Sequence, residues 1–407
     1  MPLQTLLVLS HLRWSFVYQR PQHFMSRLAG NWNVLFVEEP VHDQGPPWLE
    51  IRAVAPNLTV LVPHTAEAQP GFNDAQFPIL ESLLSTFLQN AGVEKPLVWL
   101  YTPMALPLAK QLAPRFLVYD CMDELSAFAH APLELKPRET ELLSLAAVVL
   151  TGGPSLFDAK RLLRDDVHCI PSSVDAAHFA ATNLQPDGAL ATRATELQGR
   201  HVRPRLGFFG VIDERLDVAL VAALADANSE WDLVMAGPVV KIDPGHLPQR
   251  DNIRWLGLQS YDLLPYLLTS WDVALMPFAR NDSTRFISPT KTLEYMAGGK
   301  PVVSTAISDV GRLYGEVVEI AHSHADFISA CHRVLAESPR ARASRLDNMA
   351  ALVADYSWDR SVNRIQALLD YAVKSTEPAT TPTIPISLRQ SGKSIRLAKR
   401  LTSQASR

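Results

Sequence analysis

Residues 281–305 read NDSTRFISPTKTLEYMAGGKPVVST, and this stretch predicts the local fold around it. Ser288 is a favoured helix N-cap, and Pro289 suits the first helical position, where its missing N–H costs nothing. Apolar residues then recur at helical spacing until Gly298, where a glycine pair is typical of a helix end. A β-branched strand begins after Pro301. The stretch therefore predicts a loop, a helix, a glycine turn and a strand in succession.

The start of this helix is suited to an anion, because its first backbone N–H groups are free and the helix dipole is positive there. Lys291 lies in the first turn and Glu294 follows three residues later on the same face. Together they could hold the phosphate and the ribose of a nucleotide. The alternative is an ordinary capped helix on which Lys291 and Glu294 form a solvated ion pair.

Length and composition limit the class of protein. A chain of 407 residues exceeds one typical core, which predicts two domains. The 47% of hydrophobic and 20% of charged residues are ordinary for a globular protein, and the net charge of −4 gives no reason to expect nucleic acid. The three cysteines are few and far apart, which favours a reducing compartment. With no basic leader and no run long enough to span a bilayer, we expect a cytoplasmic protein.

The carboxyl-terminal part differs in charge from the rest. Residues 383–407 contain six basic residues and no acid, which leaves 32 basic against 42 acidic residues, about −10, elsewhere. A Thr/Pro/Ser-rich stretch after Lys374 is typical of a linker, so 375–407 is predicted to be a flexible basic tail. Within it, Ile395–Leu401 is amphipathic and basic. It would suit peripheral contact with the inner membrane face, and the alternative is a tail without such contact.

Two series of apolar runs alternate with helical patterns, which predicts two parallel sheets covered on both faces. The first series of strands is Thr5–Ser10, Val34–Glu38, Leu58–Val62, Leu97–Tyr101, Phe116–Asp120, Ala147–Thr151 and Val167–Pro171. The second series is Leu206–Val211, Trp231–Ala236, Ile253–Leu256, Val273–Pro277, Pro301–Ser304 and Val317–Ile320.

The predicted domains follow from this division. Residues 1–185 would form an amino-terminal Rossmann-like domain, 186–204 a linker, and 205–356 a carboxyl-terminal Rossmann-like domain. Ser357 would cap a last helix, 357–374, which we expect to return to the amino-terminal domain.

Common catalytic signatures are missing from the sequence. It contains no Gly-rich dinucleotide fingerprint after either first strand, and no P-loop, His-Glu-x-x-His, Cys-x-x-Cys or Asp-x-Asp motif. We therefore expect neither a metal site nor a bound cofactor. In open α/β sheets ligands bind beyond the carboxyl ends of the strands, so the strand-end loops are the candidate site.

Several stretches taken together resemble a known family. The order FFGVIDERLD, LVMAGP, IRWLG, WDVALMPF and SPTKTLEYMAGGKPVVST is similar to the donor half of GT-B glycosyltransferases. It most resembles the large retaining group that uses nucleotide sugars to build bacterial polysaccharides and glycolipids. HLRWSFVYQRPQHFMSRLA and VYDCMDE resemble a subset found with cell-surface polysaccharide genes. The resemblance covers roughly residues 1–374. It implies an α/β GT-B fold of two facing, doubly wound Rossmann-like domains with a cleft between them.

The resemblance also assigns donor-site roles. Glu294 would accept hydrogen bonds from the nucleotide ribose, since a carboxylate can accept from two hydroxyls at once. Gly210 would let the backbone approach the diphosphate, and the alternative is a plain strand-end turn. Arg215 and Lys291 would offset the diphosphate charge in place of a metal ion, although Arg215 has an alternative as the partner of a nearby aspartate. The helix-end cradle would consist of Ser288, Pro289 and Thr290.

The sequence departs from the family pattern at two places. The family commonly has a second glutamate eight residues before Glu294, where this chain has Phe286. The glycine pair after the first strand is replaced by His11-Leu12-Arg13-Trp14. Both departures bear on the sugar and the stereochemistry more than on the nucleotide.

Catalysis by the retaining group needs stabilisation of the leaving diphosphate more than a protein base. An inverting enzyme would need a base near the acceptor hydroxyl, and Asp120 and Asp123 are the candidates. The alternative for Asp120 is capping of the next turn. His11 and Arg20 could line the acceptor side, with packing or surface roles as the alternative.

The predicted function is metal-independent transfer, with retention, of a sugar from a nucleotide diphosphate sugar to a glycan or lipid-linked acceptor in cell-surface polysaccharide synthesis. One alternative is a nucleotide-sugar hydrolase or epimerase of the same fold. Another is a catalytically silent module that acts as a scaffold through its basic tail.

Overall fold

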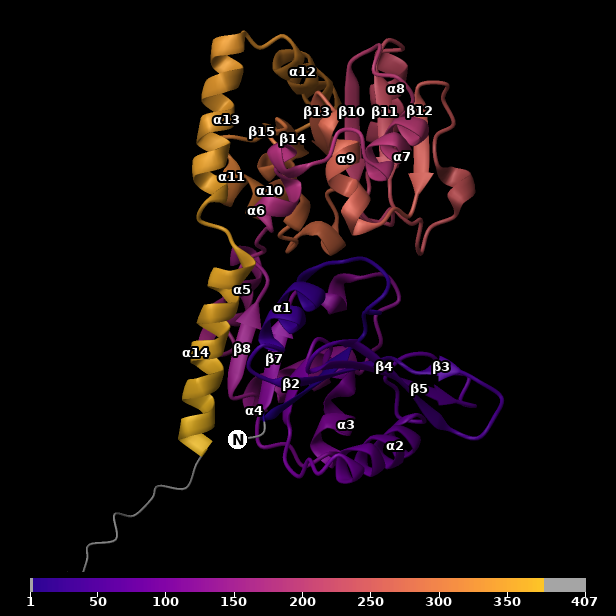
Figure 1. The fold of residues 1–407 in the computed structure, drawn as a ribbon, viewed down its shortest axis with the longest axis vertical. Coiled ribbons are helices and arrows are strands. Elements are labelled where there is room, and N and C mark those ends of the chain that lie inside the picture. The colour runs from indigo at the N-terminus through magenta and orange to yellow at the C-terminus, as the bar shows by residue number, and fades with distance from the viewer. Residues whose placement is uncertain (1–2, 377–407) are drawn as a thin grey trace, which may run out of the picture.

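The computed structural model describes residues 3–376 and contains two parallel sheets, one above the other in Figure 1. We call the sheet within residues 5–169, with the helices packed on it, the first unit. The sheet within residues 205–321, with its helices, is the second unit. The predicted boundaries at 185 and 204 stay predictions.

The first sheet has the strand order β3-β5-β2-β1-β6-β7-β8-β9, and β4 pairs with the free edge of β5. All pairings are parallel except β4–β5. Its strands are β1 Thr5–Ser10, β2 Asn33–Glu38, β3 Val41–His42, β4 Trp48–Ala55, β5 Leu58–Thr65, β6 Leu97–Leu100, β7 Leu117–Cys121, β8 Val148–Thr151 and β9 Val167–Cys169.

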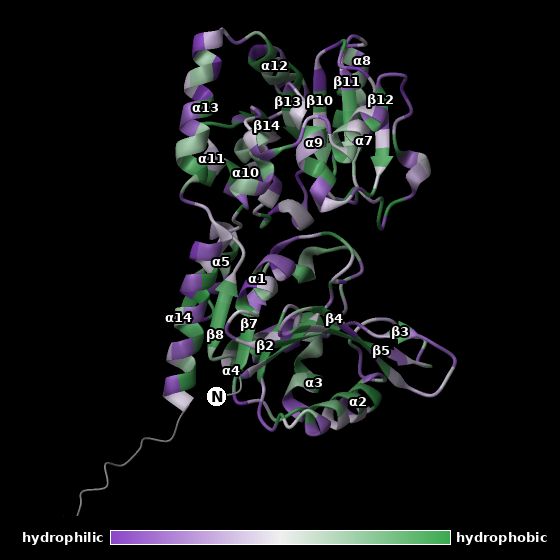
Figure 2. Cartoon of the chain, in the orientation of Figure 1, coloured by the Kyte–Doolittle hydropathy of each residue, from purple (hydrophilic) through white to green (hydrophobic). Residues whose placement is uncertain are grey.

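Alternate side chains of β1 enter different cores, as the period of two in a strand requires. Leu6 and Val8 pack with α1 and α14, whereas Leu7 and Leu9 pack with α2, α3 and α4. Both faces are therefore covered at β1, and the strands β7 and β8 of the same sheet are mostly apolar (Figure 2). The helices of this unit are α1 Arg20–Leu28, α2 Phe77–Asn90, α3 Leu106–Gln111, α4 Leu135–Leu145, α5 Pro154–Lys160 and α14 Trp358–Thr376.

The second sheet is parallel throughout, in the order β12-β11-β10-β13-β14-β15. Its strands are β10 Arg205–Phe209, β11 Asp232–Ala236, β12 Ile253–Gly257, β13 Val273–Met276, β14 Val302–Thr305 and β15 Glu319–Ala321. The remaining helices are α6 Ala176–Phe179, α7 Ala189–Gln198, α8 Val218–Ala227, α9 Leu264–Thr269, α10 Thr290–Ala297, α11 Ser308–Tyr314, α12 His324–Leu335 and α13 Pro339–Val353.

Two segments connect the units. The stretch predicted as a linker contains α7, whose Ala194 is part of the second core. After α13 the chain returns, and α14 places Trp358, Ile365 and Leu369 in a core of the first unit (Figure 1). The two connections touch where Val174 pairs with Ser357 in an isolated bridge.

The tail is outside this description. The helix α14 runs to Thr376, two residues past the predicted end at 374, and the basic stretch that follows lies beyond the described residues. Among the helices of residues 3–376, none has both the length and the apolar character needed to cross a membrane.

Candidate functional site

The helix of the opening stretch is α10, and it begins one residue later than predicted. Pro289 is the N-cap and Thr290 the first helical residue, so the prediction of Ser288 as N-cap is wrong. The ψ angle of 120° at Pro289 is extended, which leaves the proline outside the helix. The Oγ of Ser288 is buried and has no hydrogen-bond partner among residues 3–376.

Glu294 and Lys291 project from α10 without pairing. The carboxylate of Glu294 has 7% exposure for the residue, yet within the described chain it forms neither a hydrogen bond nor an ion pair. The solvated ion pair considered above is therefore not formed. Burial raises the pKa of Glu294, and Lys291 partly opposes this shift. Burial likewise lowers the pKa of Lys291, with Arg215 adding to the effect. Both groups are thus desolvated without a strong partner, which is costly unless a ligand supplies one.

The Nζ of Lys291 lies 5.7 Å from the ring centroids of both Phe208 and Phe278, in cation–π range. Beside it, Gly210 has a φ of +146°, which a residue with a side chain rarely adopts. A Cβ on Gly210 would lie 2.3 Å from Cε and 2.8 Å from Nζ of Lys291. Gly210 is therefore more than a plain turn residue, because the position of Lys291 depends on its missing side chain.

Arg215 makes the ion pair that the sequence left as its alternative role. Its NH2 group lies 2.7 Å from Oδ2 of Asp213, while its guanidinium faces the ring of Phe128 at 5.6 Å. Phe128 comes from the first unit, and Lys241 of the second unit approaches the same ring at 5.3 Å. Arg215 still lines the cavity described below, so its positive charge is available there.

Asp120 is poorly placed for the predicted role of catalytic base, and that role stays a prediction. Asp120 is fully buried and accepts three hydrogen bonds of 2.7–3.1 Å from the guanidinium of Arg20. The same guanidinium donates to the carbonyl of Ile170 at 2.6 Å. A carboxylate held in this way by a buried guanidinium is not free to contact an acceptor hydroxyl. Although Arg20 lines the cavity, its guanidinium is bonded to Asp120 and Ile170 inside the first unit.

Asp123 differs, because its carboxylate has no partner among residues 3–376 and lines the cavity. Burial raises the pKa of Asp123, while Arg215 and Arg20 oppose the shift. Asp123 is therefore the carboxylate that the first unit offers to a ligand.

The cavity itself lies between the units and is about 160 Å³. Glu294, Lys291 and Gly210 line it from the second unit, and Asp123 and Ser172 line it from the first. Typical ligand pockets measure roughly 300–1,000 Å³, so the cavity is smaller than most ligand sites when the units lie as they do here.

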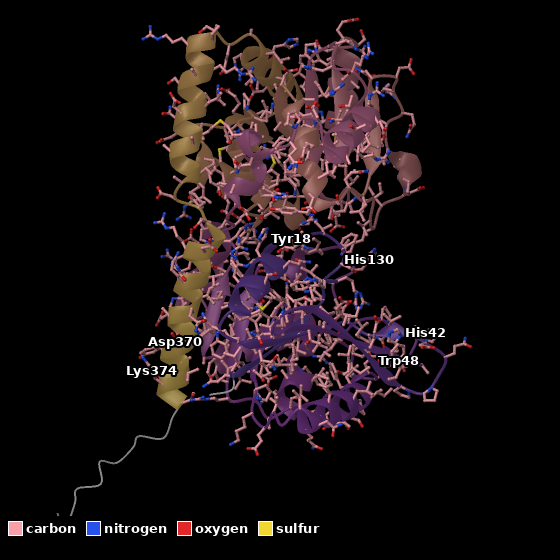
Figure 3. All side chains as sticks on the ribbon, viewed as in Figure 1. Tyr18, His42, Trp48, His130, Asp370 and Lys374 are labelled. Carbon is pink, nitrogen blue, oxygen red and sulfur yellow. The ribbon has the colours of Figure 1, made fainter. Side chains whose placement is uncertain are left out.

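Contacts across this cavity hold the units together. The hydroxyl of Ser172 donates to the carbonyl of Ser288 at 2.8 Å and accepts from Thr290 at 3.2 Å, which covers the start of α10. At another point the rings of Tyr18 and Tyr261 stack with centroids 4.9 Å apart. Figure 3 shows Tyr18 on the side of the first unit that faces the second. The Oη of Tyr261 is buried and without a partner in the described part of the chain.

His11 lies outside the residues that line the cavity. It follows β1, beside Glu39 at the end of β2, because the parallel register pairs Ser10 with Glu38. Burial, together with the charge of Lys241, lowers the pKa of His11 to about 4. Burial raises the pKa of Glu39 to about 7, and its carboxylate makes no hydrogen bond within residues 3–376. Glu39 is thus a second unpaired carboxylate on the first unit.

Phe286, which stands where the family commonly has a glutamate, packs against a core of the first unit. It does not line the cavity, whereas its neighbour Ile287 does. The ring of Phe286 thus forms an apolar contact between the two units.

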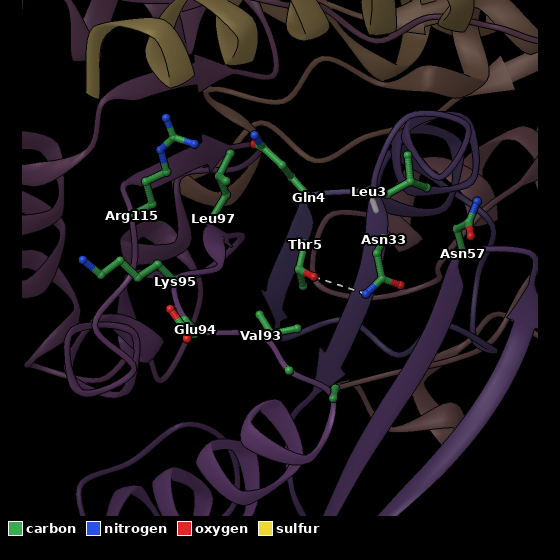
Figure 4. A pocket seen from close by; sticks show the side chains of 12 residues that line it. Leu3, Gln4, Thr5, Asn33, Asn57, Val93, Glu94, Lys95, Leu97 and Arg115 are labelled. Atoms are coloured by element: carbon green, nitrogen blue, oxygen red, sulfur yellow. Dashed lines mark hydrogen bonds between the residues drawn. The ribbon is translucent and has the colours of Figure 1, made fainter. Parts of the chain in front are cut away.

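A cavity of about 510 Å³ opens at the amino ends of β1 and β2 (Figure 4). Thr5 and Asn33 meet there in a hydrogen bond of 3.2 Å. It lies at the opposite end of the strands from the predicted site, whereas ligands of open α/β sheets bind at the carboxyl ends.

Sequence reasoning missed two residues of the cleft. Ser172 comes just after β9, and the order of the strands is a usable signal for such a strand-end position. The place of Tyr261 beside Glu294 follows only from the fold.

Known proteins resemble this chain in sequence over part of its length. Residues 203–337, which include α10, match the family model described as "Glycosyl transferases group 1". A "Putative teichuronic acid biosynthesis glycosyltransferase TuaH" from Bacillus subtilis is 27% identical over 282 residues, which cover 64% of this chain and 68% of that protein.

Solved structures share the fold over most of the chain. A sucrose-phosphate synthase from Thermosynechococcus elongatus superposes with a TM-score of 0.72 at 15% identity, over 91% of this chain and all of that one. A UDP-forming trehalose-phosphate synthase from Burkholderia xenovorans gives 0.66 at 13% identity, over 91% of this chain and 100% of that one. The fold class predicted from the sequence is confirmed.

Proposed function

We propose that this chain, a glycosyltransferase with the GT-B fold, transfers a sugar from a nucleotide diphosphate sugar to a glycan or lipid-linked acceptor during cell-surface polysaccharide synthesis. The name of the Bacillus subtilis relative supports the polysaccharide assignment, and the name of the UDP-forming neighbour is consistent with a nucleotide donor.

The observation that carries the proposal is the unpaired state of Glu294 and Lys291 in a cavity between two units. A ribose would satisfy the carboxylate through its hydroxyls, and a diphosphate would satisfy the amine and the free N–H groups of α10. Arg215, whose positive charge is partly offset by its ion pair with Asp213, would add positive charge on the side of the diphosphate. We include metal independence in the proposal because these two cations can serve the diphosphate.

Retention is also part of the proposal. The bond between the sugar and the diphosphate would break as a bond to the acceptor oxygen forms on the same face. The acceptor proton would pass to the departing diphosphate. Lys291, Arg215 and the start of α10 would stabilise the negative charge that develops there. Such a reaction needs no protein base, which agrees with the burial of Asp120 against Arg20.

Calorimetric titration tests the proposal. UDP, GDP, dTDP and their common sugars are titrated in EDTA against the wild type, Glu294→Ala and Glu294→Gln. The control is Glu316→Ala, which removes an exposed glutamate of the second unit. We expect one nucleotide to bind the wild type and the control equally, and to bind both Glu294 variants at least tenfold more weakly.

Three results would contradict the proposal or a part of it. Binding that appears only when a divalent cation is added would remove metal independence. Absence of binding by any nucleotide would favour the silent scaffold. Release of free sugar at the full rate without an acceptor would instead favour a hydrolase.

A further inference from the structure

A buried cluster of charged groups lies beneath the loop that carries Asp123. The Nζ of Lys160, at the end of α5, is 2.7 Å from Glu124 and 2.7 Å from Glu139. Glu139 also accepts a hydrogen bond of 2.7 Å from the hydroxyl of Tyr119. The side chain of Lys160 is only 4% exposed, and those of its two partners are 15% and 10% exposed. The cluster lies outside the cavity, and the proposed reaction gives it no role.

The residues of the cluster contact the chain both before and after Asp123. Glu124 follows Asp123 directly and is held by Lys160 on one carboxylate oxygen and by Ser126 on the other. Before Asp123, the Sγ of Cys121 lies 3.6 Å from the carbonyl oxygen of Asp123 and 3.8 Å from Glu139. The backbone at Asp123 is therefore fixed from below while its carboxylate faces the cavity unpaired.

A glycine completes the support for this loop. The loop packs so closely on Gly152 that a Cβ there would lie 2.7 Å from the carbonyl oxygen of Met122. Gly152 stands between β8 and α5, and α5 ends at Lys160. One side of the loop thus rests on the backbone before α5, and the other is tied to the last residue of that helix.

We propose that Lys160 is a positioning residue of the transfer reaction, which holds Glu124 and Glu139 so that the carboxylate of Asp123 is aimed at the sugar of the bound donor. The inference rests on the proposed function, because it requires a nucleotide sugar in the cavity. It goes further by assigning Asp123 to the sugar hydroxyls. On the second unit, Phe286 packs against the first unit and offers no polar group to the cavity.

If Lys160 were purely structural, its loss would weaken the binding of every ligand equally. If Lys160 positions Asp123, its loss weakens only the binding of a ligand that contacts Asp123. We therefore compare two probes, the nucleotide diphosphate that binds in the calorimetric screen and its sugar-bearing form. The variants are Asp123→Asn, Lys160→Met and the double variant, with thermal unfolding recorded for each. If Lys160→Met does not fold, Glu124→Gln replaces it, because it keeps the Lys160–Glu139 pair.

The control is Lys110→Met, which removes a lysine paired with Glu141 at 2.6 Å on the surface of the same unit. We expect each test variant to bind the nucleotide diphosphate within twofold of wild type and the nucleotide sugar at least fivefold more weakly. The double variant should bind no more weakly than Asp123→Asn alone. The control should match wild type with both probes.

Three results would overturn the inference: an equal loss for both probes, additive losses in the double variant, or no loss at all. A failure of the proposed function looks different, because the nucleotide diphosphate would then bind neither the wild type nor any variant.

Discussion

Arg20 and Asp120 lie 100 residues apart in the chain, yet the guanidinium of one and the carboxylate of the other form a bidentate pair inside the first unit. The side chains are 4% and 0% exposed. The pair joins the start of α1 to the end of β7 and, through the carbonyl of Ile170, to the segment that leads to the second unit.

Asp120→Asn should therefore act on stability. Removing one partner of a buried ion pair leaves the other charge uncompensated, at a cost of about 3–5 kcal/mol in the free energy of unfolding. Urea denaturation measures this loss. Asp226→Asn breaks the exposed pair with Arg250 and should leave the midpoint of urea denaturation close to that of wild type. A fully stable Asp120→Asn protein without activity would restore Asp120 as a candidate base.

Gly210→Ala should weaken nucleotide binding at least tenfold, because the added methyl group would displace Lys291. Gly257→Ala is the matched control. Gly257 also has a positive φ, of +65°, but nothing within 4 Å would touch its added Cβ. Alanine at either position strains the backbone by about 1–3 kcal/mol, so nucleotide affinity is compared under conditions where both variants are folded. Equal affinities would show that the position of Lys291 does not matter.

The raised pKa of Glu294 predicts a pH dependence of stability in the unliganded protein. Between the unfolded and the folded pKa, the native state binds more protons than the unfolded state, so its stability falls as the pH rises. Glu294→Gln removes this effect. The variant should be more stable than wild type by about 1–3 kcal/mol at pH 8, and the difference should shrink toward pH 4.5. Urea denaturation at both pH values measures it, and a constant difference would contradict the assignment.

Separation of the units should be required for nucleotide entry. Ser172→Cys with Thr290→Cys places two thiols where the hydroxyl oxygens are 3.2 Å apart, in a Cys169→Ala background that avoids mispairing with a half-buried thiol. The oxidised protein should bind nucleotide at least tenfold more weakly than the reduced protein, because the cavity is closed at about 160 Å³. Calorimetry with and without reductant measures the change. Each single cysteine variant should be indifferent to reductant, and equal binding by the oxidised and reduced double variant would show that nucleotide enters without separation.

Much of the fold could be predicted because the parallel strands are buried on both faces and read as short apolar runs, as in Thr5–Ser10. Among the elements that the sequence did not predict, two have a clear physical reason. The edge strand β4 is mostly exposed and lacks a regular alternation. The helix α13 buries only Met349 and Val353, so it presents no apolar stripe to recognise.

The candidate site could also be predicted only in part. Lys291 and Glu294 belong to one contiguous motif and Gly210 to another, and the resemblance predicted that all three lie at the donor site. The pairing of Asp120 with Arg20, the contact of Ser172 with Thr290 and the Lys160 cluster join distant segments. No local period or spacing encodes such contacts. The functional roles of all these residues stay predictions until the titrations above are made.

The return of α14 to the first unit has a consequence for the order in which the protein is made. The strand β8 leaves the ribosome well before Ile365 and Leu369, which belong to the helix α14 that packs on it. At about 5–20 residues per second, roughly 10–40 seconds pass between synthesis of β9 and completion of α14. During that interval part of an apolar sheet face stays open to water. A fragment that ends before Trp358 would keep that face exposed.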